Sequence, residues 1–235
     1  MIITGLQKVS LIDYPSGVCA TIFFQGCNFR CPYCYNPKLI QFSRVKSRIS
    51  EEEIFIYLKK RRGLIEAVCL TGGEPTLQDG LSNFLRRLKE MGFLIKIDTN
   101  GSNPETLNSL LNQNLVDYIA LDLKAPLIWK KYRRVINIDN KEIFDKILKS
   151  AELLINSKID YEFRTTIVPT LLEKDDIREI IRQIEGAKKY VLQDFINNKE
   201  MVNEEYRNIK PYPKTFLEEM AKEARSYVNE CEVRL

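Results

Sequence analysis

Short apolar runs alternate with amphipathic segments along most of the chain. Runs rich in β-branched and aromatic residues predict buried strands, whereas apolar residues three and four positions apart predict helices. We expect strands at residues 18–25, 66–71, 93–98, 116–121, 161–168 and 190–195. We expect helices at residues 50–63, 81–90, 104–112, 141–156, 175–185 and 215–228.

This alternation of strands and helices is typical of β/α units around a parallel sheet. Six such strands are too few to close the eight-stranded form of the barrel. We therefore predict an α/β fold, an incomplete (β/α)6 partial barrel with a C-terminal helical tail. Residues 1–195 would form the core domain, and residues 196–235 would extend it.

Composition fits one globular domain with a sizeable core, because the chain has 235 residues, of which 44% are hydrophobic and 29% charged. No apolar stretch approaches the ~20 residues that cross a bilayer, and residues 1–17 lack the apolar core of a signal peptide. We expect a cytoplasmic protein with neither a membrane nor a nucleic-acid partner. The mild net charge of +4 has two interpretations. It could come from ordinary surface lysines and arginines, or it could mark a docking face for an acidic electron-transfer protein.

Three cysteines lie within eight residues directly after the first predicted strand, as Cys27, Cys31 and Cys34 in a C-x3-C-x2-C pattern. The chain has no histidine, which excludes a zinc site of three cysteines and one histidine. An iron–sulfur cluster normally takes four thiolates. We therefore predict a four-iron cluster with three cysteine ligands and one iron open to a small molecule.

The alternative for these cysteines is a disulfide or a purely structural role. The absence of a signal peptide and of a cysteine-dense framework disfavours disulfides. Cys19 and Cys69 fall on predicted strands, where we expect small core residues.

Polar motifs follow the next three predicted strands, at residues 71–75 (TGGEP), 98–101 (DTNG) and 122–124 (DLK). Working residues in parallel α/β folds gather at the carboxyl ends of the strands. We expect these motifs to lie together with the cysteine loop at one end of the predicted partial barrel.

Gly72 and Gly73 would let a ligand approach the backbone closely. The Glu74 carboxylate could shape the turn or accept a hydrogen bond from an ammonium group. Lys124 could pair with a ligand carboxylate. Taken alone, Gly72 and Gly73 would more often form a plain turn.

Asp98, Thr99 and Asp122 place two carboxylates and a hydroxyl at neighbouring strand ends. Such oxygens suit a hard cation or a ribose. The alternative is a surface ion pair between Asp122 and Lys124, which would contribute little to stability.

The cysteine motif with Tyr33 before its last cysteine, followed by the Gly72 to Glu74 segment, resembles the radical S-adenosylmethionine (SAM) superfamily. The sequence is similar, more narrowly, to glycyl-radical enzyme activases, including those of anaerobic ribonucleoside-triphosphate reductase and of pyruvate formate-lyase. The segments that carry this likeness are residues 5–8 (GLQK), 11–15 (LIDYP), 24–28 (FQGCN) and 31–37 (CPYCYNP).

The resemblance implies one 4Fe-4S cluster per chain, held by Cys27, Cys31 and Cys34, with SAM on the fourth iron. Gly73 would contact the methionine amino group and Lys124 the methionine carboxylate. The implied SAM pocket comprises Tyr33, Cys34, Tyr35, Gly72, Gly73, Glu74, Asp98, Thr99, Asp122, Leu123, Lys124 and Arg164, and a monovalent cation would sit at Asp98, Thr99 and Asp122.

The implied activity is that of an oxidoreductase without catalytic side chains. A flavodoxin- or ferredoxin-type donor would reduce the cluster, and SAM cleavage would yield a 5′-deoxyadenosyl radical. That radical would take hydrogen from a glycine of a partner glycyl-radical enzyme under anaerobic conditions. Two alternatives stay open: a radical SAM enzyme acting on a small molecule or nucleotide, and a non-catalytic iron–sulfur redox or interaction module. Tyr35 stands where family members commonly have histidine.

Overall fold

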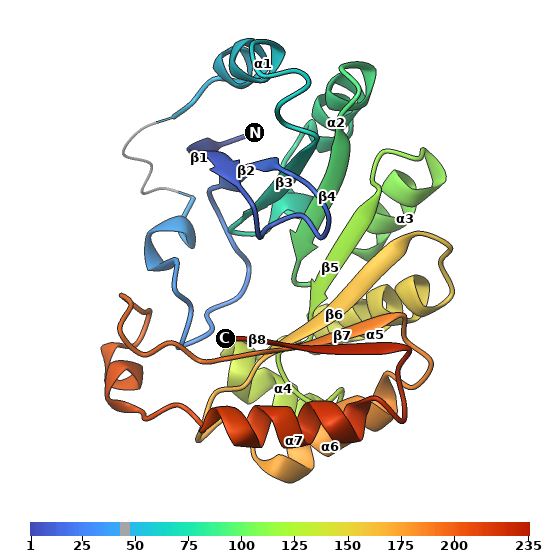
Figure 1. Ribbon diagram of the computed structural model, residues 1–235. Coiled ribbons are helices and arrows are strands. Elements are labelled where there is room, and N and C mark those ends of the chain that lie inside the picture. The colour runs from blue at the N-terminus through green and yellow to red at the C-terminus, as the bar shows by residue number, and fades with distance from the viewer. Residues whose placement is uncertain (43–47) are drawn as a thin grey trace. The chain divides into compact units, whose positions relative to one another are not determined.

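The computed structural model describes residues 1–42 and 48–235. These residues form an α/β fold whose eight strands follow chain order in one sheet, from β1 to β8. The first pair, β1 and β2, is antiparallel, whereas β2, β3 and β4 pair in parallel, as do β6, β7 and β8. The predicted open, mainly parallel α/β sheet is confirmed (Figure 1).

All twelve predicted elements are present, with ends that shift by a few residues. The strands are β2 (Cys19–Phe24), β3 (Ala67–Gly72), β4 (Leu94–Thr99), β5 (Tyr118–Asp122), β6 (Asp160–Thr166) and β7 (Lys189–Gln193). The helices are α1 (Glu51–Lys59), α2 (Leu81–Glu90), α3 (Pro104–Asn112), α5 (Lys141–Ile155), α6 (Lys174–Gln183) and α7 (Lys214–Ala224).

Three further elements were not anticipated from the sequence: β1 (Ile3–Ser10), α4 (Trp129–Ile136) and β8 (Glu230–Arg234). The described part of the chain also contains the short 3-10 helices η1 (Pro37–Leu39), η2 (Pro75–Leu77) and η3 (Glu204–Asn208). The C-terminal region is therefore not purely helical. In β8 only Cys231 and Val233 alternate with charged residues, and so short a period-2 pattern is easily missed beside the preceding helix.

The described residues divide into two compact units. The first contains residues 1–28, 38–99 and 103–119, apart from the undescribed 43–47, and the second contains residues 29–37, 100–102 and 120–235. The first unit carries β1 to β4 with α1, α2 and α3, and the second carries β6 to β8 with α4 to α7. Each unit has its own core of buried aliphatic and aromatic side chains.

Local signals in the first unit explain where its helices begin. Ser50 and Glu53 form the predicted capping box at the start of α1. Pro104 opens α3, and the side chain of Asn103 accepts from the amide of Thr106. These caps satisfy amides that the helices themselves leave without partners.

In the second unit, α6 and α7 lie side by side, and α7 packs on β7 and β8 (Figure 1). Two ion pairs join the helices, Lys174 to Glu219 at 2.6 Å and Arg178 to Glu223 at 3.0 Å. The C-terminal strand is therefore held from one face by a helix of its own unit. Among the described residues, no helix combines the length and the apolar character needed to cross a membrane.

Candidate functional site

The three motif cysteines follow β2 in the sequence. In the first unit, the amide of Cys27 donates to the carbonyl of Ile40 at 3.0 Å. In the second, the amide of Cys34 donates to the carbonyl of Cys31 at 3.1 Å, and burial raises the pKa of the Cys34 thiol. Within the described ranges, no group of three Cys, Asp or Glu side chains is placed to hold a metal ion. The three thiols fit a cluster by their chemistry and by their spacing in the sequence.

The glycine turn after β3 packs against the backbone that leads into Cys27. A Cβ atom on Gly73 would come within 2.0 Å of the Gly26 carbonyl oxygen. The amide of Glu74 donates to that same oxygen at 2.7 Å, and the amide of Gly73 donates to Phe24 at 2.9 Å. In the first unit these glycines thus allow two chain segments to touch, a use distinct from the ligand approach expected from the sequence.

Glu74 is buried and organises the end of this turn. Its Oε1 atom accepts from the Thr76 amide at 3.1 Å, from the Thr76 hydroxyl at 2.6 Å and from the Thr99 hydroxyl at 2.7 Å. Of its two expected roles, these contacts support shaping the turn. They also place Thr99, at the end of β4, in contact with the turn after β3.

Asp98, next to Thr99 on β4, pairs with a buried cation. The Lys96 ammonium lies 2.7 Å from Asp98 Oδ1, and the Lys96 side chain is only 3% exposed. Any cation binding to Asp98 would therefore compete with a lysine already in place.

In the second unit, Asp122 at the end of β5 binds two cationic side chains. Lys124 Nζ lies 2.9 Å from Oδ2, and Arg164 Nε on β6 lies 2.8 Å from Oδ1. Burial alone would raise the pKa of Asp122, but the charges of Arg164 and Lys124 outweigh it and lower the pKa well below its usual range. Burial opposes the charge of Lys124, yet the Asp122 carboxylate outweighs this and raises the pKa of Lys124. Leu123 between them is fully buried and donates its amide to the Arg164 carbonyl at 2.8 Å.

This cluster continues across the second unit as a chain of alternating charges. Arg164 Nη1 lies 3.9 Å from buried Glu162, and Arg234 of β8 approaches the same carboxylate at 3.4 Å. Arg234 also contacts Glu232, which pairs with Lys189 at 2.8 Å. The predicted site residue Arg164 is therefore connected to the C-terminal strand.

Tyr33, between Cys31 and Cys34, is buried in the second unit. Its hydroxyl has no hydrogen-bond partner among the described residues. Burial raises the pKa of this phenol, and the positive charge of Lys124 partly offsets the effect. Buried hydroxyl groups normally have a hydrogen-bond partner, so the Tyr33 hydroxyl is available to a polar ligand.

Tyr35 is held by the segment that follows β7. Its ring stacks on Phe195, with 6.3 Å between the ring centroids, and its hydroxyl accepts from the Ile196 amide at 2.7 Å. The Lys199 ammonium lies 5.0 Å from the centre of the ring. These contacts give Tyr35 a packing role in its own unit.

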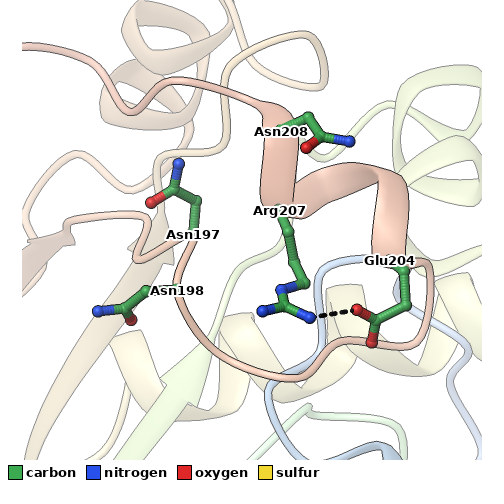
Figure 2. Close-up of a pocket in the computed structure, with 5 residues that line it drawn as sticks. All are labelled: Asn197, Asn198, Glu204, Arg207 and Asn208. Carbon is green, nitrogen blue, oxygen red and sulfur yellow. Dashed lines mark hydrogen bonds and ion pairs between the residues drawn. The ribbon is translucent and has the colours of Figure 1, made fainter.

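One pocket lies in a part of the chain to which sequence analysis assigned no site. It measures about 420 Å³ and is lined by Asn197, Asn198, Glu204, Arg207 and Asn208 (Figure 2). No motif in the sequence indicates it, because its side chains come from an irregular segment and from η3.

Comparison with known proteins assigns the family. A profile of the radical SAM superfamily matches residues 21–185. A protein of Methanocaldococcus jannaschii, provisionally named a glycyl-radical enzyme activating enzyme, is 36% identical over 99% of this chain and 95% of its own. The pyruvate formate-lyase-activating enzyme of Clostridium pasteurianum is 31% identical over 87% of this chain and 88% of its own.

A likeness among solved structures supports the fold alone. Streptococcus suis SuiB bound to its precursor peptide SuiA has a TM-score of 0.67 at 15% identity, over 89% of this chain and 47% of SuiB. Members of the radical SAM superfamily use SAM and a 4Fe-4S cluster with three cysteine ligands. This protein belongs to that superfamily, as shown by its C-x3-C-x2-C loop, its open α/β sheet and the matches over most of the chain.

Proposed function

We propose that this radical SAM enzyme activates a partner glycyl-radical enzyme by removing a hydrogen atom from one of its glycines. The observation that carries the proposal is the match with the Methanocaldococcus jannaschii relative, because it spans 99% of this chain and 95% of that one. The likeness therefore includes the C-terminal segment as well as the cysteine loop.

Cys27, Cys31 and Cys34 would hold the cluster, since they lie in one loop and the chain has no histidine. When bound, the cluster and SAM supply a one-electron reductive cleavage that yields methionine and a 5′-deoxyadenosyl radical. The chain contributes orientation of the reacting groups and exclusion of water.

The cations around Asp122 suit the methionine carboxylate of SAM. Lys124 and Arg164 bring two cationic side chains to the Asp122 carboxylate, and Arg164 also approaches Glu162. An ammonium and a guanidinium carry more donors than one carboxylate uses, and an arginine can bind a carboxylate through two parallel N–H groups. The buried Tyr33 hydroxyl is a further polar group that a bound ligand could satisfy.

The remaining site assignments follow from the same proposal. Gly73 would offer its backbone to the methionine amino group, and Tyr33, Tyr35 and Leu123 would border the adenosine. A monovalent cation at Asp98, Thr99 and Asp122 would compete with Lys96 for one carboxylate and with Lys124 and Arg164 for the other.

The electron donor would be a flavodoxin- or ferredoxin-type protein in a reducing, cytoplasmic and anaerobic setting. Residues 1–195 would provide the radical SAM core, with residues 196–235 as its extension. The test is to reconstitute the protein anaerobically, reduce it with SAM present, and mix it with a co-purifying or neighbouring-gene glycyl-radical enzyme.

We expect the doublet of a glycyl radical in the electron paramagnetic resonance spectrum of the partner, and 5′-deoxyadenosine as a product. Cys31→Ala should abolish both signals, whereas Cys231→Ala, which alters a cysteine outside the loop, should retain them. Formation of 5′-deoxyadenosine without a radical on any such partner would favour a small-molecule or nucleotide substrate. Failure to produce 5′-deoxyadenosine would instead indicate a non-catalytic iron–sulfur module.

A further inference from the structure

Strands β6, β7 and β8 lie side by side in the second unit (Figure 1). Because side chains alternate between the two faces of a strand, Glu162 and Arg164 of β6 point to the same face. Arg164 is opposite Val191 of β7 in the sheet. Two residues further along β7, Gln193 is opposite Arg234 of β8. The charged side chains at positions 162, 164 and 234 therefore share one face of this three-stranded sheet.

The Glu162 carboxylate lies between two arginines on this face. Its side chain is only 2% exposed, and a carboxylate so buried is stable only beside cations or hydrogen-bond donors. Arg234 faces it with both terminal nitrogens, Nη1 at 3.4 Å from Oε1 and Nη2 at 3.5 Å from Oε2. Arg164 Nη1 lies further away, at 3.9 Å from Oε1. Of the two arginines, Arg234 is therefore the closer partner of Glu162.

Arg164 stands between two carboxylates, those of Glu162 and Asp122. Its Nε atom donates to Asp122 Oδ1 at 2.8 Å, a much shorter contact than the one that Nη1 makes with Glu162. The Arg164 side chain is 10% exposed, so water screens its attraction to either carboxylate only weakly. The two carboxylates thus compete for one guanidinium, and the positive charge of Arg234 beside Glu162 favours the contact with Asp122.

We propose that Arg234 is a positioning residue for SAM binding. By compensating the charge of Glu162, it keeps Arg164 on Asp122. The inference rests on the proposed function, which places the methionine carboxylate of SAM beside Lys124 and Arg164. Without Arg234, the buried Glu162 carboxylate would draw Arg164 away from Asp122, because a buried charge that has lost its partner is costly. Arg234 thus acts on the ligand through Arg164.

SAM binding tests this role without turnover. The full chain is reconstituted anaerobically and its cluster is left oxidised, so that SAM is not cleaved, and equilibrium dialysis gives the Kd. The matched ligand is decarboxylated SAM, which keeps the adenosine, the sulfonium and the amino group but lacks the carboxylate. The control variant is Arg178→Met, which breaks a 3.0 Å ion pair with Glu223 between α6 and α7 of the same unit.

We expect Arg234→Met to raise the Kd of SAM about tenfold, the effect of losing one charged hydrogen bond. The Kd of decarboxylated SAM should stay the same as in the parent, because that ligand has no carboxylate for Arg164 to bind. Arg234→Lys keeps the charge without the fork of donors and should give an intermediate Kd for SAM. Arg178→Met should bind both ligands as the parent does.

Removal of the competing carboxylate should reverse the defect. In the Glu162→Gln, Arg234→Met double variant, no buried charge draws Arg164 away from Asp122, so the Kd of SAM should return to near the parental value. If Arg234 merely held β8 in place, the double variant would bind SAM as weakly as Arg234→Met, and both ligands would lose affinity alike. Should Arg234→Met not fold, as judged by circular dichroism, Arg234→Lys with and without Glu162→Gln gives the same comparison.

Three results would overturn the proposal: no SAM binding by the parent, an unaltered Kd of SAM in Arg234→Met, or no recovery in the double variant. The radical assay separates this role from the proposed function. A glycyl radical on a partner, with a SAM affinity that does not depend on Arg234, would refute the positioning role and leave the proposed function in place. A SAM affinity that depends on Arg234 and Glu162, with no radical on any partner, would refute the proposed function and retain the positioning role.

Discussion

The carbonyl oxygen of Gly26 accepts a hydrogen bond from the amide of Glu74 at 2.7 Å, which joins the turn after β3 to the residue before Cys27. The contact requires a bare backbone at Gly73, where a side chain would collide with that oxygen. Placement of the first cysteine thus depends on a residue 46 positions away in sequence.

Gly73→Ala should displace the strand end that leads into Cys27. A Cβ atom 2.0 Å from the Gly26 oxygen forces the backbone to move, at a cost of about 1–3 kcal/mol in unfolding free energy. We also expect iron content after reconstitution to fall. Urea unfolding and an iron assay measure the two effects.

Gly80→Ala is the matched control, because a Cβ atom there meets no atom within 4 Å although φ is +81°. It should cost about 1 kcal/mol from backbone strain and leave iron content unchanged. A parental iron content in Gly73→Ala would contradict the proposed link between the turn and the cysteine loop.

Thr99→Val should destabilise the first unit, because it removes a donor from the buried Glu74 carboxylate. The cost of weakening a buried hydrogen-bonded charge is about 1–3 kcal/mol. Thr215→Val, at an exposed position of α7, should change stability by less than about 0.5 kcal/mol. Equal unfolding free energies for the two variants would show that the Thr99 hydroxyl is dispensable.

Lys124→Met should weaken SAM binding about tenfold or more, because it removes one of the two cations around Asp122. Iron content should stay at the parental value, since no cysteine of the loop is altered. Equilibrium dialysis with SAM and an iron assay separate the two effects. Lys141→Met, which removes an exposed pair with Asp145, is the control. Loss of iron in Lys124→Met would assign Lys124 to the support of the cluster.

Cys231 should make the stability of the fold depend on alkaline pH. Burial raises the pKa of this thiol on β8 from 9.0 to about 11. Because the folded pKa lies above the unfolded one, the contribution to stability is complete below about pH 8.5 and is lost as the pH rises towards 11.

Urea unfolding of the parent and of Cys231→Ala, with reductant at pH 8 and pH 10.5, tests this dependence. The parent's advantage over the variant should shrink by about 1–2 kcal/mol between the two conditions. A difference independent of pH would show that the thiol titrates alike in the folded and unfolded states.

The sequence predicted six strands and six helices because their hydrophobic periods are clear and their ends carry caps such as Ser50 and Pro104. It missed β1, whose register is interrupted between Gln7 and Ser10, and whose residues 7–9 are exposed. An edge strand with few buried residues gives a weak period-2 signal.

At the candidate site, the sequence identified individual site residues but did not identify the side chains that they contact. Strand-end positions identified Glu74, Asp98 and Asp122, but no local pattern shows that Thr76, Lys96 and Arg164 are their partners. Asp122 and Arg164 lie on different strands. The other two pairs, Glu74 with Thr76 and Asp98 with Lys96, depend on how their side chains are oriented. The pocket at Asn197 to Asn208 lacked any signal, since asparagines in loops are common turn formers.

The ion chain from Arg164 through Glu162 to Arg234 bears on how the protein can be shortened or tagged. The family profile ends at residue 185, yet a chain cut there would lack β7 and β8 and leave the buried Glu162 without the arginine at residue 234. The stretch that the family profile matches and the stretch that these contacts hold together are therefore different. Affinity tags and fusion partners intended for this protein belong at a distance from Arg234, behind a flexible linker.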